Sequence, residues 1–552
     1  MKNKLRIGLV ILITCLILPG FAQKPVFKWG RLYQKQSMLS GGNSLIGFND
    51  VNYYTLGTIK HGWWIFGSYM PAITQNDNRH TPVTVREFSN KRGKVNLVLS
   101  GDIIYLDNTF HIFASKYNTS IDKNIIYKKT LNGDLSEESD WEEFDEMYAK
   151  NSNDARNFDF MRSEDDSKIL LYRNNPVTKT SKKESVTYKM YDNKFKQLWE
   201  KKLEFDVDEK KYDILRYSVT NDGQVILLGR RDLTKKEKVK KMPSYKYLLY
   251  LYDNQKDQLE EFQISLGKMY ITEISYTIDN KNNKLMLAGF YSNKGPGNLT
   301  GTFYQRIDIS TKKVDIEQTK EFERDFMMDH MTEKKVDKNK ELHSYDIREL
   351  IKRDDGGLTL VAEQYYVVVT TSSNTVNGRT TTTTTYHYHY NDIIVVNINS
   401  DGKIGWSLTI PKVQHSINDG GYMSSYAFHV KDDKMYFIFY DNPDNYNNNT
   451  NKRTNKRLKI NVSPMPSLHK SVIGMAVVDY EGYVTRSVLQ KSNKDLKVKR
   501  GLPLFVPKLS RYMNDKLLVQ AHYGKKYQLG FLTFDNNAGT GGVESRKKNA
   551  EK

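Results

Sequence analysis

The chain has almost no cysteine, and this absence excludes several classes of protein. Its 552 residues contain one cysteine, Cys15, inside an apolar run near the N-terminus. The rest of the chain therefore needs no disulfide and offers no thiol nucleophile or thiolate ligand. An exported chain without disulfides is more typical of a bacterial envelope than of small eukaryotic secreted domains. No Pro/Ser-rich linker divides the sequence, which favours one large array over several domains.

Catalytic and cofactor motifs are also missing. No catalytic motif is recognisable, and the chain has no Cys-x-x-Cys-His haem site and no sialidase Asp box around Trp406. It also lacks the Gly-His and Trp-Asp pattern of WD40 repeats. We predict no cofactor. Nucleic acid is not an expected partner, because an exported chain without a nucleic-acid-binding motif rarely binds one.

The sequence has only one apolar run of note, from Ile7 to Leu18, about a dozen residues long. Basic residues precede it, and small residues follow it before Gln23, as in an export signal. A membrane span needs about 20 residues, so we predict a signal peptide over residues 1–22 and no transmembrane segment after cleavage. An uncleaved anchor is the alternative. We expect the folded part to cover residues 23–535, and residues 536–552, rich in Gly and Lys, to be a disordered tail.

One pattern recurs along the chain: an Asp or Asn with polar neighbours leads into a short apolar strand. It returns at intervals of about 60 to 80 residues, which is typical of propellers and other all-β arrays. The copies begin at Asp107, Asp165, Asn221, Asn282, Asp354, Asp432 and Asn514. Each unit reads as four short strands joined by turn residues.

This repeat predicts an all-β fold, a single large β-propeller of about seven or eight four-stranded blades. We count about eight units, and seven blades with an irregular first segment is the alternative. The last unit has three strands, ending near Phe534. We expect residues 26–33 to supply its fourth strand and close the ring, because closure protects strand edges that otherwise template aggregation. Aromatic spacing predicts small helical insertions at residues 136–148 and near Phe326.

The long loops fall in two classes that share one face of a propeller: those between second and third strands, and those between blades. Binding residues concentrate on such loops. The alternative is that loop length has drifted without function.

The net charge is +19, which favours an anionic glycan, lipopolysaccharide or an acidic envelope protein as the partner. Three loops on the predicted loop-rich face carry clustered basic residues, and if they converge they form an anion-binding rim. The alternative is that each is a solvated loop. The candidate ligand-binding cations are Arg230, Arg231, Lys235, Lys236, Lys240, Lys241, Lys452, Arg453, Lys499 and Arg500.

A Thr-rich segment around Asn377-Gly378 predicts a long hairpin, since this dipeptide is the strongest short hairpin signal. A two-residue turn pairs Tyr366 with His389, and Val368 with His387. His387 and His389 then share one strand face, where two histidines are candidate metal ligands. With no third ligand in the sequence, we predict cross-strand packing rather than a metal site. Tyr366 and Tyr388 are candidate stacking faces for a sugar or peptide.

The same register places Glu363 opposite Asp392. Two carboxylates paired in this way repel or share a proton. Either the register slips, or a cation sits beside them, or the pair is functional, in which case they are the candidate catalytic residues.

Residues 362–366, 388–396, 424–427 and 432–437 read AEQYY, YHYNDIIVV, SSYA and DDKMYF. This combination resembles uncharacterised exported, β-propeller-like proteins of the Bacteroidota, mainly over residues 344–440. The resemblance implies the periplasm or cell surface of a Gram-negative bacterium, and it implies no activity or site residue.

Two hypotheses about function follow. The first is a non-enzymatic ligand- or protein-binding scaffold of the cell envelope that uses its basic, loop-rich face. The second is a propeller-based glycosidase or lyase acting on an acidic polysaccharide, which needs two convergent carboxylates or a Tyr or His base beside an arginine. Carboxylates and arginines clustered in the central channel favour the enzyme, and an apolar channel with charge only on its rim favours the binder.

Overall fold

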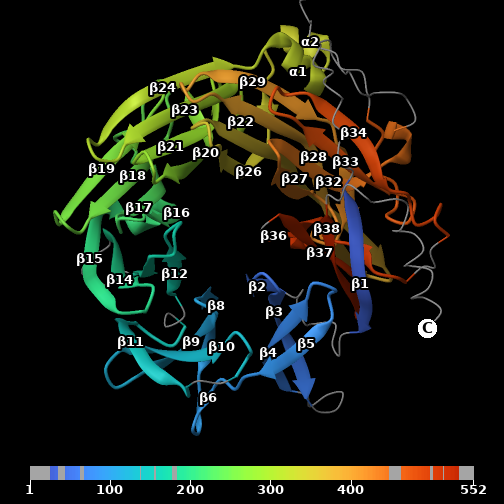
Figure 1. The fold of residues 1–552 in the computed structure, drawn as a ribbon. Helices are drawn as coiled ribbons and strands as arrows, with labels where there is room; N and C mark the ends of the chain where they lie inside the picture. Colours follow the sequence, from blue (N-terminus) through green and yellow to red (C-terminus); the bar gives the residue numbers. More distant parts are fainter. Residues whose placement is uncertain are drawn as a thin grey trace, which may run out of the picture.

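The computed structural model describes residues 25–34, 44–61, 68–136, 139–153, 157–176, 183–446, 462–497, 501–513 and 515–533. These residues form eight antiparallel sheets of four or five strands arranged as a ring, a β-propeller of eight blades, with two further two-stranded sheets (Figure 1). The predicted fold class is therefore confirmed, and the seven-blade alternative is wrong. The predicted signal peptide and C-terminal tail lie outside the described residues.

Blades 1 to 4 have the same order, in which each strand pairs with the next in the chain. Blade 1 holds β2 (Ser44–Phe48), β3 (Asn52–His61), β4 (Ser68–Asp77) and β5 (Pro82–Glu87). Blade 2 holds β8 (Val98–Leu106), β9 (Thr109–Asn118), β10 (Lys123–Asn132) and β11 (Glu142–Tyr148). Blade 3 holds β12 (Asp159–Arg162), β13 (Lys168–Asn174), β14 (Lys183–Asp192) and β15 (Gln197–Asp208). Blade 4 holds β16 (Tyr212–Val219), β17 (Val225–Asp232), β18 (Tyr245–Asp253) and β19 (Gln258–Ile264).

Blades 5 to 8 carry the additions. Blade 5 holds β20 (Tyr270–Asp279), β21 (Lys284–Ser292), β23 (Gly301–Asp308) and β24 (Lys313–Glu321). Blade 6 holds β26 (Tyr345–Lys352), β27 (Leu358–Val376), β28 (Arg379–Ile398) and β29 (Ile404–Ile410), and β30 (Gln414–Ile417) also pairs with β28. Blade 7 holds β31 (Ala427–Lys431), β32 (Lys434–Asp441), β33 (Val472–Val478) and β34 (Val484–Gln490). Blade 8 holds β35 (Leu504–Phe505), β36 (Arg511–Met513), β37 (Lys516–Tyr523), β38 (Lys526–Thr533) and β1 (Val26–Gln34).

Short elements connect the blades. They are the strand pairs β6 (Lys91–Arg92) with β7 (Val95–Asn96) and β22 (Asn298–Leu299) with β25 (Leu342–His343), the helices α1 (Arg324–His330) and α2 (Glu333–Asp337), and the 3₁₀ turns η2 (Glu209–Lys211), η3 (Pro443–Tyr446) and η4 (Pro507–Leu509). No helix among the described residues is long and apolar enough to cross a membrane.

The ring closes as the sequence predicts. β1 pairs antiparallel with β38, from Val26 opposite Thr533 to Gln34 opposite Lys526. The N-terminal strand thus completes the last blade, and the edge of β38 is covered by backbone hydrogen bonds rather than left open.

The repeated Asp/Asn/Gly positions lie at the tight turns between first and second strands. Asp166, Gly223, Asn283 and Gly356 have φ between 52° and 84°. Asp, Asn and Gly adopt this left-handed region more readily than other residues, which explains why the repeat is visible in the sequence.

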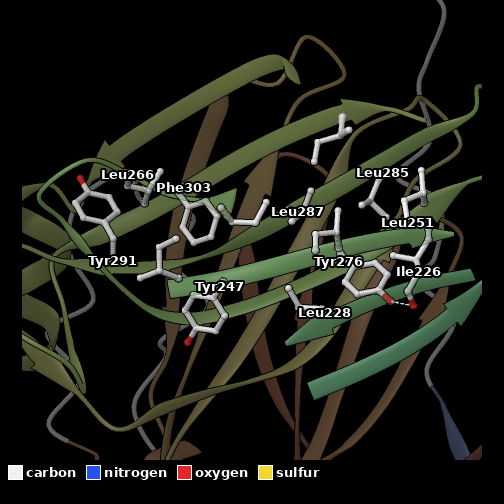
Figure 2. Close-up of a cluster of buried hydrophobic side chains, with 14 of the residues drawn as sticks. Ile226, Leu228, Tyr247, Leu251, Leu266, Tyr276, Leu285, Leu287, Tyr291 and Phe303 are labelled. Atoms are coloured by element: carbon white, nitrogen blue, oxygen red, sulfur yellow. Dashed lines mark hydrogen bonds between the residues drawn. The ribbon is translucent and has the colours of Figure 1, made fainter. Parts of the chain in front are cut away.

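The core consists of clusters between neighbouring blades. The described residues form eight such clusters, and each draws its buried side chains from two adjacent sheets. Figure 2 shows the one between blades 4 and 5, where the Tyr276 hydroxyl donates to the Ile226 carbonyl at 3.4 Å. A strand in the middle of a blade therefore needs apolar side chains on both faces, as in the run Val225–Leu228.

One predicted helix is wrong and one is confirmed. Residues 142–148 form the outer strand β11, in which Glu142 lies across from Lys128 of β10 and pairs with it, and Glu146 lies across from Ile125 and pairs diagonally with Lys123. An exposed outer strand needs no alternation of apolar and polar residues. The acidic sequence of β11 therefore lacks the pattern by which a strand is predicted. The helix near Phe326 is α1, with Phe326 and Met327 buried.

Candidate functional site

The long loops lie at the face that the sequence predicts. In four-stranded antiparallel blades, the connections between second and third strands share a face with those between blades. The long connections between β17 and β18 and between β32 and β33 belong to the first class, and those between β24 and β26 and between β34 and β35 to the second. The insertion between the second and third strands of blade 6 lengthens β27 and β28 themselves, which only residues 377–378 join. We call the face that carries these connections the loop face.

The basic loop of blade 4 neutralises part of its own charge. Arg230 pairs with Asp232 at 3.3 Å, and its guanidinium lies 4.8 Å from the centre of the Tyr245 ring. Arg231 pairs with Glu237 at 2.6 Å, and this hydrogen bond lowers the pKa of the Glu237 carboxyl to about 2. The four remaining predicted cations of this loop are exposed: Lys235, Lys236, Lys240 and Lys241.

The other predicted basic residues, Lys452, Arg453, Lys499 and Arg500, lie outside the described residues. The convergence of the three basic loops therefore stays a prediction.

The hairpin register is confirmed at its base. Tyr366 lies opposite His389, and Val368 opposite His387. β30 adds a third strand that brings in His415, which the sequence reading missed because it comes from a separate short strand. The rings stack in a column: Tyr366 on His389 at 4.6 Å, His389 on His415 at 4.7 Å, and His415 on His387 at 5.3 Å.

The rings of this column pack against one another, and His387 Nδ1 lies 3.1 Å from His415 Nε2. Within the described ranges, no group of three or more His, Cys, Asp or Glu is placed to hold a metal ion. Tyr366 uses one ring face against His389. Tyr388 lies opposite Val367 and Ser416 in the same three strands.

The predicted pairing of Glu363 with Asp392 is wrong. A register shift between Glu363 and Tyr365 places Glu363 opposite Ile393. Asp392 instead accepts from the backbone N–H of Lys412 at 3.1 Å and lies 3.3 Å from Nδ1 of His330. The bulge removes the like-charge contact that a regular register would force.

Glu363 is the centre of a buried ionic network. Its side chain is fully buried, and its carboxylate accepts from Lys412 Nζ at 2.8 Å and from Ser425 Oγ at 2.7 Å. Arg348 Nε lies 3.4 Å from the same carboxylate. Lys412 also donates to the Tyr390 carbonyl at 2.9 Å. Burial lowers the pKa of the Lys412 ammonium, and the nearby Glu363 carboxylate opposes that shift.

A pocket of about 550 Å³ opens next to this network, between blades 6, 7 and 8. Arg348 and Glu349 reach it from β26, the residues around Phe428 from β31, and Lys508 and Arg511 from η4 and β36. Figure 1 shows that β26 and β36 lie on the inner side of the ring. The pocket is therefore formed by inner strands of the ring, by the residues that precede β31 and by the turn η4 within blade 8.

Three cationic side chains line the pocket: Arg348, Lys508 and Arg511. Lys508 Nζ donates to the Tyr390 hydroxyl at 2.6 Å and lies 4.1 Å from the centre of that ring. Burial lowers the pKa of Lys508 to about 8; Glu363 opposes this shift, while Arg348 adds to it. Burial also raises the pKa of the Glu349 carboxyl.

Aromatic side chains complete the wall. Tyr512 is 60% exposed, and the centre of its ring lies 5.3 Å from that of His429 in a tilted contact. Burial lowers the pKa of His429 to about 4, so its ring is neutral at pH 7. The Tyr426 hydroxyl is buried and has no hydrogen-bond partner among the described residues. A pocket with clustered cations, aromatic faces and a free hydroxyl is suited to an anionic ligand with a planar or sugar-like body.

The sequence reading missed Arg348, Lys508 and Arg511. Arg348 comes from blade 6, whereas Lys508 and Arg511 come from blade 8, more than 150 residues later in the chain, so no sequence cluster marks all three. The one usable signal was the long interblade segment 491–508, which ends at Lys508.

No protein-family model matches the sequence, and no curated protein matches it. Among solved structures, the polysaccharide lyase Uly1 is similar at 11% identity, covering 83% of this chain and 95% of that one, with a TM-score of 0.33. The WD40 domain of SCAP from fission yeast is similar at 10% identity, covering 92% and 98%, with a TM-score of 0.36. Similarities this low carry no argument about function, and the fold rests on the sheet pairing itself.

Proposed function

We propose that the protein is a non-enzymatic binding propeller of the bacterial cell envelope, exported to the periplasm or cell surface of a Gram-negative bacterium. Its ligand is an anionic glycan, the anionic part of a lipopolysaccharide, or an acidic envelope protein. The binding site is the pocket between blades 6, 7 and 8, with the basic loops of the loop face as an outer electrostatic field that attracts the partner.

One observation carries this proposal: Arg348 of blade 6 converges on one pocket with Lys508 and Arg511 of blade 8. Arg511 is exposed, and its guanidinium donates to the Lys508 and Ser510 carbonyls, which leaves its positive charge uncompensated by these contacts. The unpartnered Tyr426 hydroxyl supports a polar ligand, because a buried hydroxyl without a hydrogen bond costs about 1–3 kcal/mol.

The test is retention of the purified protein on a panel of acidic and neutral glycans at two salt concentrations. The variant Lys508→Met/Arg511→Gln removes two charges from the pocket. The control Lys240→Gln/Lys241→Gln removes two charges from the blade 4 loop. Since a hydrogen bond to a charged group contributes about 1.5–3 kcal/mol, we expect the pocket variant to lose roughly 10- to 100-fold in affinity, and the control less than about threefold.

Two outcomes contradict the proposal. Equal losses in both variants mean that binding is spread over the basic surface and not placed in the pocket. Absence of retention on every acidic glycan excludes a glycan ligand, and pull-down from envelope extracts then tests for an acidic protein.

A second candidate function is a lyase or glycosidase acting on an acidic polysaccharide. The observation that favours it is Lys508 beside Tyr390, since a lysine with pKa near 8 is a suitable general base near neutral pH. The acid Glu349 and Arg348 share the pocket, which matches the channel cluster expected of an enzyme. Product formation in the same glycan panel, lost in Lys508→Met, would replace the binding function with this one.

A further inference from the structure

The distal part of the blade 6 hairpin, residues 366–386, is a two-stranded ribbon without neighbours along most of its length. β26 pairs with β27 only as far as Gln364, and on the other side β30 and Asn418 reach β28 only from Tyr386 to Tyr390. Residues 367–384 are almost all exposed to solvent. An exposed strand edge presents unpaired backbone donors and acceptors that fit another strand.

The free edge of β27 is regular. The N–H of Tyr365 donates to the Ser344 carbonyl at 2.8 Å, on the side away from β28. Backbone groups alternate along a strand, so every second residue from there directs its N–H and C=O to this edge. No register shift interrupts the pairing with β28 between Tyr365 and Val376. The edge-facing residues are Val367, Val369, Thr371, Ser373 and Thr375.

The ribbon also lacks the usual protection of an edge. Charged residues make up 27% of the chain, yet residues 366–386 contain a single charged residue, Arg379, which follows the turn. Lysine, proline and bulges are the common devices that prevent edge pairing, and the ribbon has none of them. The two strands of the ribbon pair along their backbones, and hydroxyl contacts link them further: Thr375 Oγ1 lies 2.9 Å from Thr380 Oγ1.

We propose that the free edge of β27 pairs antiparallel with the same edge of a second copy of this chain. A two-fold axis at Thr371 places Val369 opposite Ser373 and Val367 opposite Thr375. All of these residues direct their backbone groups to the edge, so the pairing forms about ten hydrogen bonds. A neutral edge has no charge with which to select an acidic partner, and the ribbon of a second copy is itself a neutral edge of matching length.

The net charge of +19 does not oppose this pairing. A strand rises about 3.3 Å per residue, so pairing centred on Thr371 keeps the two rings roughly 30 Å apart. The Debye length at physiological salt is about 8 Å. Repulsion between the rings is therefore screened, and the contact is confined to the uncharged ribbons.

The first test is sedimentation equilibrium of the mature chain over about two decades of micromolar concentration. Thr371→Lys places two ammonium groups opposite each other at the two-fold axis, where like charges repel. Thr384→Lys is the matched control, because Thr384 lies directly across the ribbon from Thr371 on β28. We expect the wild type and Thr384→Lys to reach twice the mass of one chain, and Thr371→Lys to need at least tenfold higher concentration.

The second test reads out the register and does not depend on the stability of Thr371→Lys. Opposed residues in a hydrogen-bonded antiparallel pair have Cα atoms about 5.5 Å apart, within the range of a disulfide. In a Cys15→Ala background, Thr371→Cys should form a covalent dimer under mild oxidation and Thr384→Cys should not. A wild type that stays monomeric throughout, or equal cross-linking at both positions, overturns the proposal.

Discussion

Two groups of basic residues differ in how they are built. In the blade 4 loop the cations are neighbours in sequence, and its two arginines are paired with acids a few residues away. In the pocket, Arg348 of blade 6 is brought by the ring next to Lys508 and Arg511 of blade 8. In the blade 4 loop, cations that are close in sequence are exposed or paired with nearby acids. In the pocket, the fold brings together cations that are far apart in sequence.

The energetics of the two groups differ as well. The pair Arg231–Glu237 lies near the surface, where ion pairs contribute about 0–1 kcal/mol. The pair Lys412–Glu363 is almost completely buried, with 1% and 0% of the side chains exposed. Removing one partner of a buried pair leaves an uncompensated charge that costs several kcal/mol. The four predictions that follow sharpen this comparison between buried and exposed groups.

The largest effect is expected for Lys412→Met, which leaves the Glu363 carboxylate without its closest cation. We expect the free energy of unfolding to fall by about 3–5 kcal/mol, as for other broken buried pairs. Chemical denaturation measures it, with Arg231→Met as the exposed control at less than about 1 kcal/mol. The double variant Lys412→Met/Glu363→Gln should recover part of the loss. If Lys412→Met lowers the free energy of unfolding no more than Arg231→Met does, the buried pair contributes no more to stability than the exposed one.

The next effect concerns His80, which is buried at the junction of blades 1 and 8, where burial lowers its pKa to about 4. The unfolded chain has a histidine pKa of about 6.5 and binds the proton first. Stability is therefore complete above pH 6.5 and falls as the pH drops toward 4, by about 3 kcal/mol from this group. His80→Gln should flatten the pH dependence of unfolding, whereas the exposed His343→Gln should leave it unchanged.

A smaller effect is expected on the pH dependence of glycan binding, which distinguishes binding at the pocket from binding at the blade 4 loop. With a pKa of about 8, Lys508 is protonated at pH 7 and mostly neutral at pH 9, whereas an ordinary lysine titrates near 10.4. Retention of an anionic glycan should fall about tenfold between pH 7 and 9, since one charged contact contributes about 1.5–3 kcal/mol. Retention that stays constant to pH 9 would assign binding to the loop lysines.

The smallest effect is expected for Tyr512→Ala, which removes an exposed ring from the pocket wall. Aromatic contacts contribute about 0.5–1.5 kcal/mol, so affinity for a glycan should drop by about two- to tenfold. Tyr523→Ala removes a similarly exposed ring from the same blade, outside the pocket, and should change nothing. A ligand held by charge alone would leave both variants equal to the wild type.

The hairpin shows how far local rules reach. Asn377-Gly378 determines the turn, and the turn determines the pairs down to Tyr366 with His389. Three residues further from the turn, the pairing predicted from it no longer holds, because a bulge lies between Glu363 and Tyr365. Nothing in the local sequence marks that bulge. It follows from the tertiary requirement that Glu363 reach Lys412 and Ser425 rather than Asp392.

The sequence by itself determined the repeat, the turns and the closure of the ring. These depend on neighbouring residues: left-handed φ at Asp, Asn and Gly, apolar runs buried on both faces, and the missing fourth strand that residues 26–34 supply. Only the tertiary structure decided where the pocket lies and which charges are buried. Arg348 becomes a neighbour of Lys508 and Arg511 because the ring brings β26 of blade 6 close to η4 and β36 of blade 8. Burial then alters the energy of the charges, which no sequence pattern records.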